Sequence, residues 1–323
     1  MREIVLIADD AYLADDSPRR DATPAAPTFA QLAALLRYAR RVPGQVDWLE
    51  LLADELGLAS PVSDADLALR AVGAVAAEPQ ARALRAFAVR LEAGLTQVRL
   101  AADGLIDMTP EAAAQLSRAF NTEFVRSPEP YRLEAADDGS FILHGAWLED
   151  VTTVDPRRLL GGTITEGLPS GERVAPLRKL WSEIELWLAQ NRSRWSHWRE
   201  VPNALWLCGA ARRVARPARR ATVDCALFAR DVTARGLALM AGVSAYSACS
   251  VPGRWPSCGH VYVVAPLQQV VGEWLPVVQE LLGTRRLAHC RLHLNDRSFD
   301  LGPRDRWRLW RRAADWRSLV TRP

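Results

Sequence analysis

The fold is decided by residues 174–198, VAPLRKLWSEIELWLAQNRSRWSHW, and by residues 203–210 after them, NALWLCGA. The first stretch places its apolar residues at the i, i+3, i+4, i+7 spacing of one helix face: Leu177, Leu180, Trp181, Ile184, Trp187 and Leu188. The second is a short apolar run that ends in small residues, which is typical of a buried strand. We therefore expect a Trp-striped helix over Val174–Trp198 that leads into a strand over Ala204–Cys208.

The flanking sequence places this pair in an α/β protein. Two further strands are expected at His260–Ala265 and Leu287–Leu294, with a helix at Leu267–Leu282 between them. Such a strand–helix–strand order favours parallel strands with helices on the faces of the sheet. A buried strand is also expected at Glu3–Ala8. The predicted fold class is a mixed, partly parallel sheet flanked by helices.

The N-terminal third of the chain is predicted to be mostly helical. Residues 28–120 follow a loop and contain helical patterns at Gln45–Leu56, Ser63–Ala77 and Pro79–Leu91, with another helix start at Pro110. Two strands are then expected, at Phe124–Glu134 and Ser140–Trp147. We divide the chain into residues 1–27, a strand and loop; 28–120, the helical region; and 121–323, the α/β region. These parts are predicted to form one integrated domain.

Composition excludes several classes of protein. The 323 residues are 49% hydrophobic and 24% charged, which is near the globular average. The five cysteines are odd in number and lack a C-x-x-C pair, which argues against a disulfide framework or a zinc site. No apolar run approaches the roughly 18 residues of a membrane span. We expect a cytoplasmic protein with no membrane partner.

A cluster of arginines follows the predicted strand Ala204–Cys208. After Gly209, five arginines fall within nine residues: Arg212, Arg213, Arg216, Arg219 and Arg220. Arginines hold phosphate or carboxylate groups by paired hydrogen bonds. Ligands of open α/β sheets bind beyond the carboxyl ends of the strands. The pattern therefore predicts an anion-binding segment that includes Gly209, although a solvated basic loop has the same pattern.

The C-terminus is a second basic segment. From Arg304 to Pro323 there are seven arginines and two aspartates. The two basic segments carry +10 against a net charge of +3, so the rest of the chain carries −7. We predict partner-binding residues here: Arg306, Trp307, Arg308, Trp310 and Arg311. Stacking of the tryptophans on nucleic-acid bases is a weaker alternative. In a third interpretation, the tryptophans pack a terminal helix onto the core.

The sequence offers no set of catalytic residues. There is no G-x-S-x-G motif and no phosphate-binding glycine loop. Asp9 and Asp10, at the end of the first strand, are weak candidates for a metal site. His289 and His293 share one face of a predicted strand, where a two-His metal site is conceivable. We predict no catalytic residue and no cofactor.

Five short pieces of the chain resemble a known family. In order they are Leu105–Glu111, Leu180–Glu185, Pro202–Gly209, Ala234–Ala238 and Arg306–Arg312. They resemble the RpfE-type regulatory proteins, whose members are often labelled predicted cofactor-independent phosphoglycerate mutases. The resemblance implies a regulatory association, or a metal-dependent mutase or phosphohydrolase. Two departures oppose the second implication. Leu188–Asn191 lacks the family's acidic-His-Pro-Val-Asn stretch, and Leu207–Ala210 replaces its Trp-Gly-Gly-Gly.

Two functions of different classes follow from this reasoning. The favoured one is a non-catalytic regulatory or binding protein that engages an anionic small molecule or a protein partner through the arginine segments. The alternative is a metal-dependent phosphohydrolase or phosphoglycerate-mutase-like enzyme, which alone would need a divalent metal. Nucleic-acid binding is a weaker third possibility, and it would be marked by a strong salt dependence.

Overall fold

The structure of the protein, a computed structural model, describes residues 1–11, 27–58, 64–73, 82–124, 131–145, 151–172, 174–209, 224–247, 250–253 and 255–305. These residues form two compact units. Unit 1 takes its described residues from 1–11, 27–58 and 224–305, and unit 2 takes them from 64–209. Unit 2 is therefore inserted between two parts of unit 1. The three-part division and the single integrated domain stay predictions. The predicted loop before residue 27 lies largely outside the described residues.

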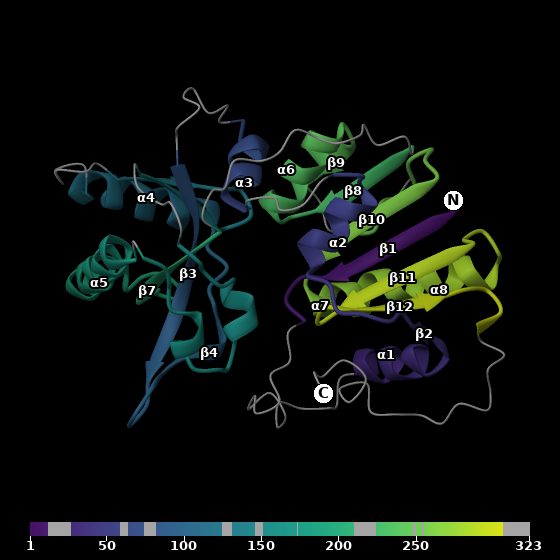
Figure 1. The fold of residues 1–323 in the computed structure, drawn as a ribbon, viewed down its shortest axis with the longest axis horizontal. Coiled ribbons are helices and arrows are strands. Elements are labelled where there is room, and N and C mark those ends of the chain that lie inside the picture. Colours follow the sequence, from purple (N-terminus) through teal and green to yellow (C-terminus); the bar gives the residue numbers. More distant parts are fainter. Residues whose placement is uncertain are drawn as a thin grey trace. The chain divides into compact units, whose positions relative to one another are not determined.

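Unit 1 is built on a mixed sheet. Its described strands lie in the order β2-β12-β11-β1-β10-β8-β9, and Figure 1 shows β1 between β10 and β11. The five strands from β11 to β9 are parallel, and β12 and β2 extend the sheet antiparallel at one edge. The partly parallel sheet is therefore confirmed. The strands are β1 (Glu3–Ala8), β2 (Arg40–Arg41), β8 (Cys225–Ala229), β9 (Ser244–Tyr246), β10 (His260–Ala265), β11 (His289–Leu294) and β12 (Arg297–Leu301).

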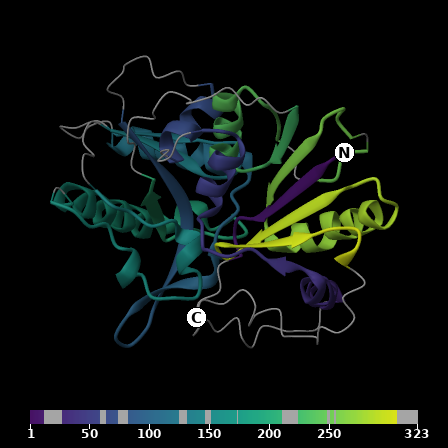
Figure 2. The same ribbon diagram turned by 45° about the vertical axis from the view of Figure 1, so that its right-hand side comes forward.

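The predicted strand–helix–strand unit is also confirmed. The chain leaves β10, forms α7 (Leu267–Gln269), a π-helical turn (Val270–Trp274) and α8 (Leu275–Gly283), and returns as β11. Both β10 and β11 pair with β1 in parallel, so this crossover passes over β1. The colours of Figure 2 show the three strands side by side. Residues 4–8 of β1 are all apolar and buried, which suits this central position because both faces of the strand are covered.

Helices cover the two faces of this sheet. On one face, Ile4 and Leu6 share a buried cluster with Leu32 of α1 (Pro27–Tyr38) and Val278 of α8. On the other face, α6 (Val232–Ala241) contacts β8. The end of α2 (Trp48–Glu55) contacts β10 and β11, because Glu55 accepts hydrogen bonds from Tyr262 and Arg291. None of the helices in the described ranges combines the length and apolar character needed to cross a bilayer.

Unit 2 contains an antiparallel sheet. Among its described strands the order is β4-β3-β6-β5. The long strand β3 pairs with β6 along residues 82–86, with β7 along 85–89 and with β4 along 89–93. In Figure 1 the hairpin of β3 and β4 projects from this unit. The strands are β3 (Arg82–Ala93), β4 (Val98–Leu105), β5 (Arg132–Ala135), β6 (Phe141–Gly145) and β7 (Ala204–Cys208), and the helices are α3 (Asp64–Ala71), α4 (Pro110–Phe124) and α5 (Ala175–Gln190).

The mostly helical N-terminal region is not confirmed, because the predicted helix Pro79–Leu91 is wrong. Leu84, Phe87, Ala88 and Leu91 do have helical spacing, yet this segment is the central strand β3. Its even-numbered residues 84–88 join one buried cluster, whereas Phe87 and Val89 join another on the opposite face. A strand buried on both faces loses the polar–apolar alternation by which a strand is recognised in sequence.

The Trp-striped helix is shorter than predicted. It ends at Gln190, and a 3-10 turn follows at Arg192–Trp195. The stripe nevertheless continues in space, because the Trp187 and Trp195 rings lie 5.2 Å apart. The strand predicted from Phe124 is also wrong at its start, because α4 extends through Phe124. That ring stacks at 4.2 Å on Phe120, one helical turn earlier.

The predicted strand Ala204–Cys208 is confirmed as β7, and its neighbour Asn203 extends the pairing with β3. The Asn203 side chain accepts a hydrogen bond from the Leu91 amide at 2.7 Å and donates one to the Leu91 carbonyl at 2.8 Å. The side-chain amide thus makes the two hydrogen bonds that the backbone of one further paired residue would make. This contact explains an asparagine at the start of the Asn203–Gly209 motif.

Candidate functional site

The carboxyl edge of the parallel strands in unit 1 is where ligands bind in open α/β sheets. The helix after β8 leads outward to β9, whereas the helix after β10 leads in the opposite direction to β11. Because such crossovers are right-handed, two that lead in opposite directions along the sheet place their helices on opposite faces. The loops that follow β8 and β10 therefore turn to opposite faces, and the carboxyl edge between these two strands is the usual place for a ligand. The residues at this point are Asp9, Asp10, Arg230, Asp231 and Pro266.

The acidic residues at this edge hold the starts of the two helices. Asp10 Oδ1 accepts a hydrogen bond from the Leu267 amide at 2.6 Å, at the start of α7. Asp231 Oδ1 accepts from the Thr233 and Ala234 amides at 2.8 and 3.1 Å, at the start of α6. These bonds satisfy amides that have no partner inside their helices. The structure therefore gives Asp10 a capping role at the start of α7, and the metal site considered from sequence stays a prediction.

The candidate metal positions considered from sequence are Asp9, Asp10 and the two histidines of β11. Asp9 is buried, and in the described ranges no three His, Cys, Asp or Glu side chains are placed to hold a metal ion. His289 and His293 stand at the two ends of β11, four residues apart, which is about 13 Å at the rise of a strand. They do not converge on one site.

His293 is a buried, neutral histidine near the carboxyl edge. Its Nδ1 lies 3.0 Å from Ser298 Oγ on the paired strand β12. Burial lowers the pKa of His293 to about 4, although the carboxylates of Asp296 and Asp47 and the Val46 carbonyl act in the opposite direction. The loop before α2 covers it, since the Val46 amide donates to the Asp296 carbonyl at 3.0 Å. The site therefore holds an uncharged imidazole at neutral pH.

The amino edge of the same sheet carries an ionic network that we did not predict. Glu3 on β1 is in register with both His260 and His289 on the two neighbouring strands. Its carboxylate oxygens lie 2.8 Å from His289 Nδ1 and 3.3 Å from His260 Nδ1. Asp300 on β12 lies 3.5 Å from His289 Nε2. Both nitrogens of His289 therefore face carboxylates, which suits the protonated ring.

The pKa values at this edge follow from these contacts. The hydrogen bond from His289 lowers the pKa of Glu3, and the same bond raises the pKa of His289. Arg291 continues the network, donating to Asp300 at 3.0 Å and to Glu55 of α2 at 2.6 Å. Burial raises the pKa of Glu55, against the opposing charge of Arg291. Sequence could not reveal this group, because the register that assembles it joins residues more than 250 positions apart.

In unit 2, Gly209 ends β7 in a position that only glycine fits. Its φ is +68°, and a Cβ there would lie 2.6 Å from the Asp64 Cβ. The Gly209 amide donates to Thr153 Oγ1 at 2.9 Å, and its carbonyl accepts from the Ala65 amide at 3.4 Å. Because β7 is antiparallel to β3, the carboxyl-end rule on which we based the anion site does not apply here. The structure thus explains Gly209 by close packing.

Beneath the end of β7 lie two buried arginines whose charges are matched by nearby acids. Arg85 is 1% exposed and donates to Asp138 at 2.8 Å and to Ser140 at 3.0 Å. Arg157 lies 2.6 Å from Asp155, and both guanidinium groups lie over the Phe87 ring, at 4.5 and 5.7 Å. Such stacking is favoured by the charge distribution of the ring. These arginines are committed to the fold of unit 2.

The other predicted binding residues lie outside the described residues. They are Arg212, Arg213, Arg216, Arg219 and Arg220, together with Arg306, Trp307, Arg308, Trp310 and Arg311. What the structure does place are the ends of the segment that holds the first five. The chain leaves unit 2 at Gly209, at the carboxyl end of β7, and is next described at Asp224, at the amino end of β8 in unit 1. The arginine-rich segment thus connects the two units.

Comparison with known proteins gives distant similarities. No family model matches the chain, and no curated protein matches it. Among solved structures, the PH0037 protein from Pyrococcus horikoshii aligns with a TM-score of 0.46 and 13% identity, over 93% of this chain and 87% of that one. The cofactor-independent phosphoglycerate mutase from Thermoplasma acidophilum DSM 1728 aligns with a TM-score of 0.38 and 16% identity, over 93% and 89%. The RpfE-type resemblance is not confirmed, and the chain has only a weak structural similarity to a phosphoglycerate mutase.

Proposed function

We propose that this protein binds an anionic ligand of the phosphate or carboxylate class through Arg212, Arg213, Arg216, Arg219 and Arg220, and that it acts by binding. The observation that carries the proposal is the density of charge: five arginines in nine residues, with no acidic residue among them. Guanidinium groups bind phosphate and carboxylate oxygens in pairs, so several arginines on one short segment form a strong anion-binding set.

The described part of unit 2 supports this interpretation indirectly. Arg85 and Arg157 are buried beside Asp138 and Asp155, so their charges are matched within the unit. The segment after Gly209 begins where β7 is held by hydrogen bonds to Thr153 and Ala65. The last described residue before the arginines is therefore held in place within unit 2.

No specific observation favours the metal-dependent phosphohydrolase. It would need several acidic or histidine ligands that converge, and the described residues contain no such group of three. Asp10 already accepts a hydrogen bond from Leu267. We therefore propose only the binding function. The carboxylates of an acidic protein surface would be recognised by the same arginines as those of a small anion.

The test is a charge reversal with a matched control. The variant Arg212→Glu, Arg213→Glu, Arg216→Glu changes the charge by six, and the control Arg192→Glu, Arg194→Glu, Arg199→Glu makes the same change at three exposed arginines of unit 2. Inorganic pyrophosphate is the probe, titrated by calorimetry at low salt. We expect at least about a tenfold weaker Kd in the first variant, because each charge-assisted hydrogen bond contributes about 1.5–3 kcal/mol.

Three results would contradict the proposal. The first is an unchanged Kd in the Arg212 variant, and the second is an equal loss in the control, which would show a general charge effect. The third is the absence of any pyrophosphate binding to the unmodified protein at low salt, where screening is weakest. Unchanged far-UV circular dichroism would establish that both variants are folded.

A further inference from the structure

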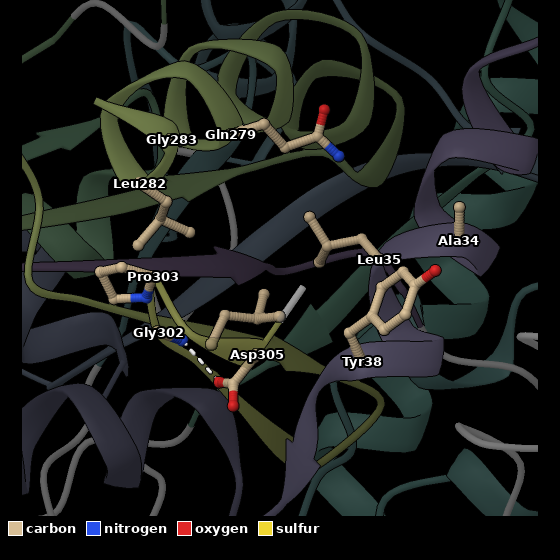
Figure 3. A pocket seen from close by; sticks show the side chains of 10 residues that line it. Ala34, Leu35, Tyr38, Gln279, Leu282, Gly283, Gly302, Pro303 and Asp305 are labelled. Carbon is tan, nitrogen blue, oxygen red and sulfur yellow. Dashed lines mark hydrogen bonds between the residues drawn. The ribbon is translucent and has the colours of Figure 1, made fainter. Parts of the chain in front are cut away.

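Unit 1 contains an apolar pocket between α1, α8 and the end of β12. Its cavity volume is about 270 Å³, and its walls include Leu35 and Tyr38 from α1, Leu282 from α8, and Leu301 and Pro303 from the chain after β11. In Figure 3, Leu35 and Tyr38 face Leu282 and Pro303 across the cavity. An open apolar pocket of this size is a place where an aromatic side chain or small ligand would bury its surface.

The pocket wall is also where the chain begins its C-terminal segment. A turn at the end of β12 is closed by the Asp305 amide, which donates to the Gly302 carbonyl at 3.0 Å, and by Asp305 Oδ2, which accepts from the Gly302 amide at 2.7 Å. Figure 3 shows this second bond beside the cavity. Both Gly302 and Asp305 line the pocket. The eighteen residues that follow include Trp307, Trp310 and Trp316.

We propose that the indole ring of Trp307 occupies this pocket, so that the C-terminal segment is an internal ligand of unit 1. Trp307 lies two residues beyond Asp305, a backbone span of about 7 Å at most. A tether this short gives an effective concentration in the millimolar range or higher, which favours Trp307 over the tryptophans farther along. The exposed Gln279 carboxamide at the pocket offers a hydrogen-bond acceptor to the indole N–H.

This occupant selects one of the roles considered for the C-terminal residues. Trp307 was assigned to a partner, with packing of the tryptophans onto the core as an alternative; here Trp307 takes that alternative, with α1 and α8 as the surface. Arg306 and Arg308 flank it in sequence, and their charged groups would stay in water while the ring is buried. The inference uses only the pocket and the C-terminal segment, so it can fail while the anion-binding function stands, and the reverse.

Hydrogen exchange of the full chain tests the occupant. In Trp307→Ala we expect amides in 34–38 and 279–283 to exchange about tenfold faster, because docking of the ring restricts local opening of both helices. Trp316→Ala is the matched control and should leave both segments unchanged. Trp307→Phe should restore most of the protection, since a phenyl ring retains the apolar contact. Unchanged exchange in Trp307→Ala, or an equal effect in Trp316→Ala, overturns the proposal.

A change on the pocket side gives an independent reading. Ala34 is exposed and lines the pocket, so Ala34→Trp supplies a competing indole without disturbing the core. We expect residues 306–312 to exchange about tenfold faster in this variant while 279–283 stay protected. No change at 306–312 would show that the segment is seated elsewhere. Protection that falls on hundredfold dilution would assign the indole to a second copy, which also overturns the proposal.

Discussion

The two ends of β11 hold two histidines with opposite acid–base behaviour. His289 and His293 lie on the same face of the same strand, yet the pKa of His289 is raised and that of His293 is lowered to about 4. At the amino end, the half-exposed His289 faces the carboxylates of Glu3 and Asp300. At the carboxyl end, His293 is buried against Ser298. Two histidines only four residues apart on one strand thus differ in charge, because one is hydrated and faces carboxylates while the other is buried.

The largest expected effect comes from His293 in acid. An unfolded histidine takes up a proton near pH 6.5 and the folded His293 only near pH 4, so between these values the unfolded state binds more protons and stability rises with pH. This shift amounts to about 3 kcal/mol of stability lost as pH falls from 6.5 to 4. We expect His293→Gln to lack this loss in urea unfolding curves. An identical loss in variant and unmodified protein would contradict the assignment.

A second prediction concerns the carboxyl edge, where an acid caps a helix. Asp10→Ala should lower the free energy of unfolding by about 1 kcal/mol, because the Leu267 amide loses its hydrogen-bond acceptor. Asp10→Asn is the control and should keep most of the stability, since asparagine caps helices about as well as aspartate. Exchange of the Leu267 amide, followed by NMR, checks the local cause. Equal stability of the alanine variant and the unmodified protein would argue against the cap.

The smallest expected effect is at the amino edge, where the acid pairs with an imidazolium. Glu3→Gln should lower the pKa of His289 in an NMR titration, because the hydrogen bond to Glu3 is the main cause of its rise. The stability change should be about 1 kcal/mol or less for a partly exposed pair. Glu50→Gln, the same change at an exposed position of α2, should leave the titration of His289 unaltered.

The contribution of His289 to stability depends on pH in the opposite direction to that of His293. The contribution of His289 is fully present below its unfolded value of about 6.5 and is lost as pH rises through its raised folded pKa. The contribution of Glu3 is present above its unfolded value of about 4.3 and is lost as pH falls through its lowered folded pKa. The pair is therefore strongest between these limits. A stabilisation that grew above neutral pH would rule out this pairing.

The parts predicted from sequence are those in which local pattern and tertiary position agree. Residues 4–8 of β1 are an uninterrupted apolar run because they lie at the centre of the parallel part of the sheet. β10, the helix after it and β11 follow the ordinary crossover. The segment of β3 was predicted wrongly, because a strand that is buried on both faces can also show the spacing of a helix. In that segment the tertiary position overrides the local preference.

The polar sites were less predictable, since they depend on register and burial. Nothing in the sequence near Glu3 indicates His260 or His289, and only the pairing of β1 with both neighbours brings them together. Asp10 was noticed for its charge, but its role is set by the position of the Leu267 amide. Gly209 was assigned to a ligand, and no sequence pattern indicated that close packing on Asp64 also requires a glycine there. The helix cap, the strand register and the steric limit each depend on a residue that is distant in sequence.

The long separation between β1 and its partners has a consequence for how the protein is made. β1 must wait for β10 and β11, whose residues follow it by more than 250 positions, before the centre of its sheet can close. At ordinary rates of synthesis that wait is roughly 15–60 s. During this time the apolar segment Ile4–Ile7, fully buried in the finished fold, has no strand to pair with. The nascent chain therefore carries an unpaired apolar segment throughout the synthesis of unit 2, the kind of exposed surface that favours aggregation before folding is complete.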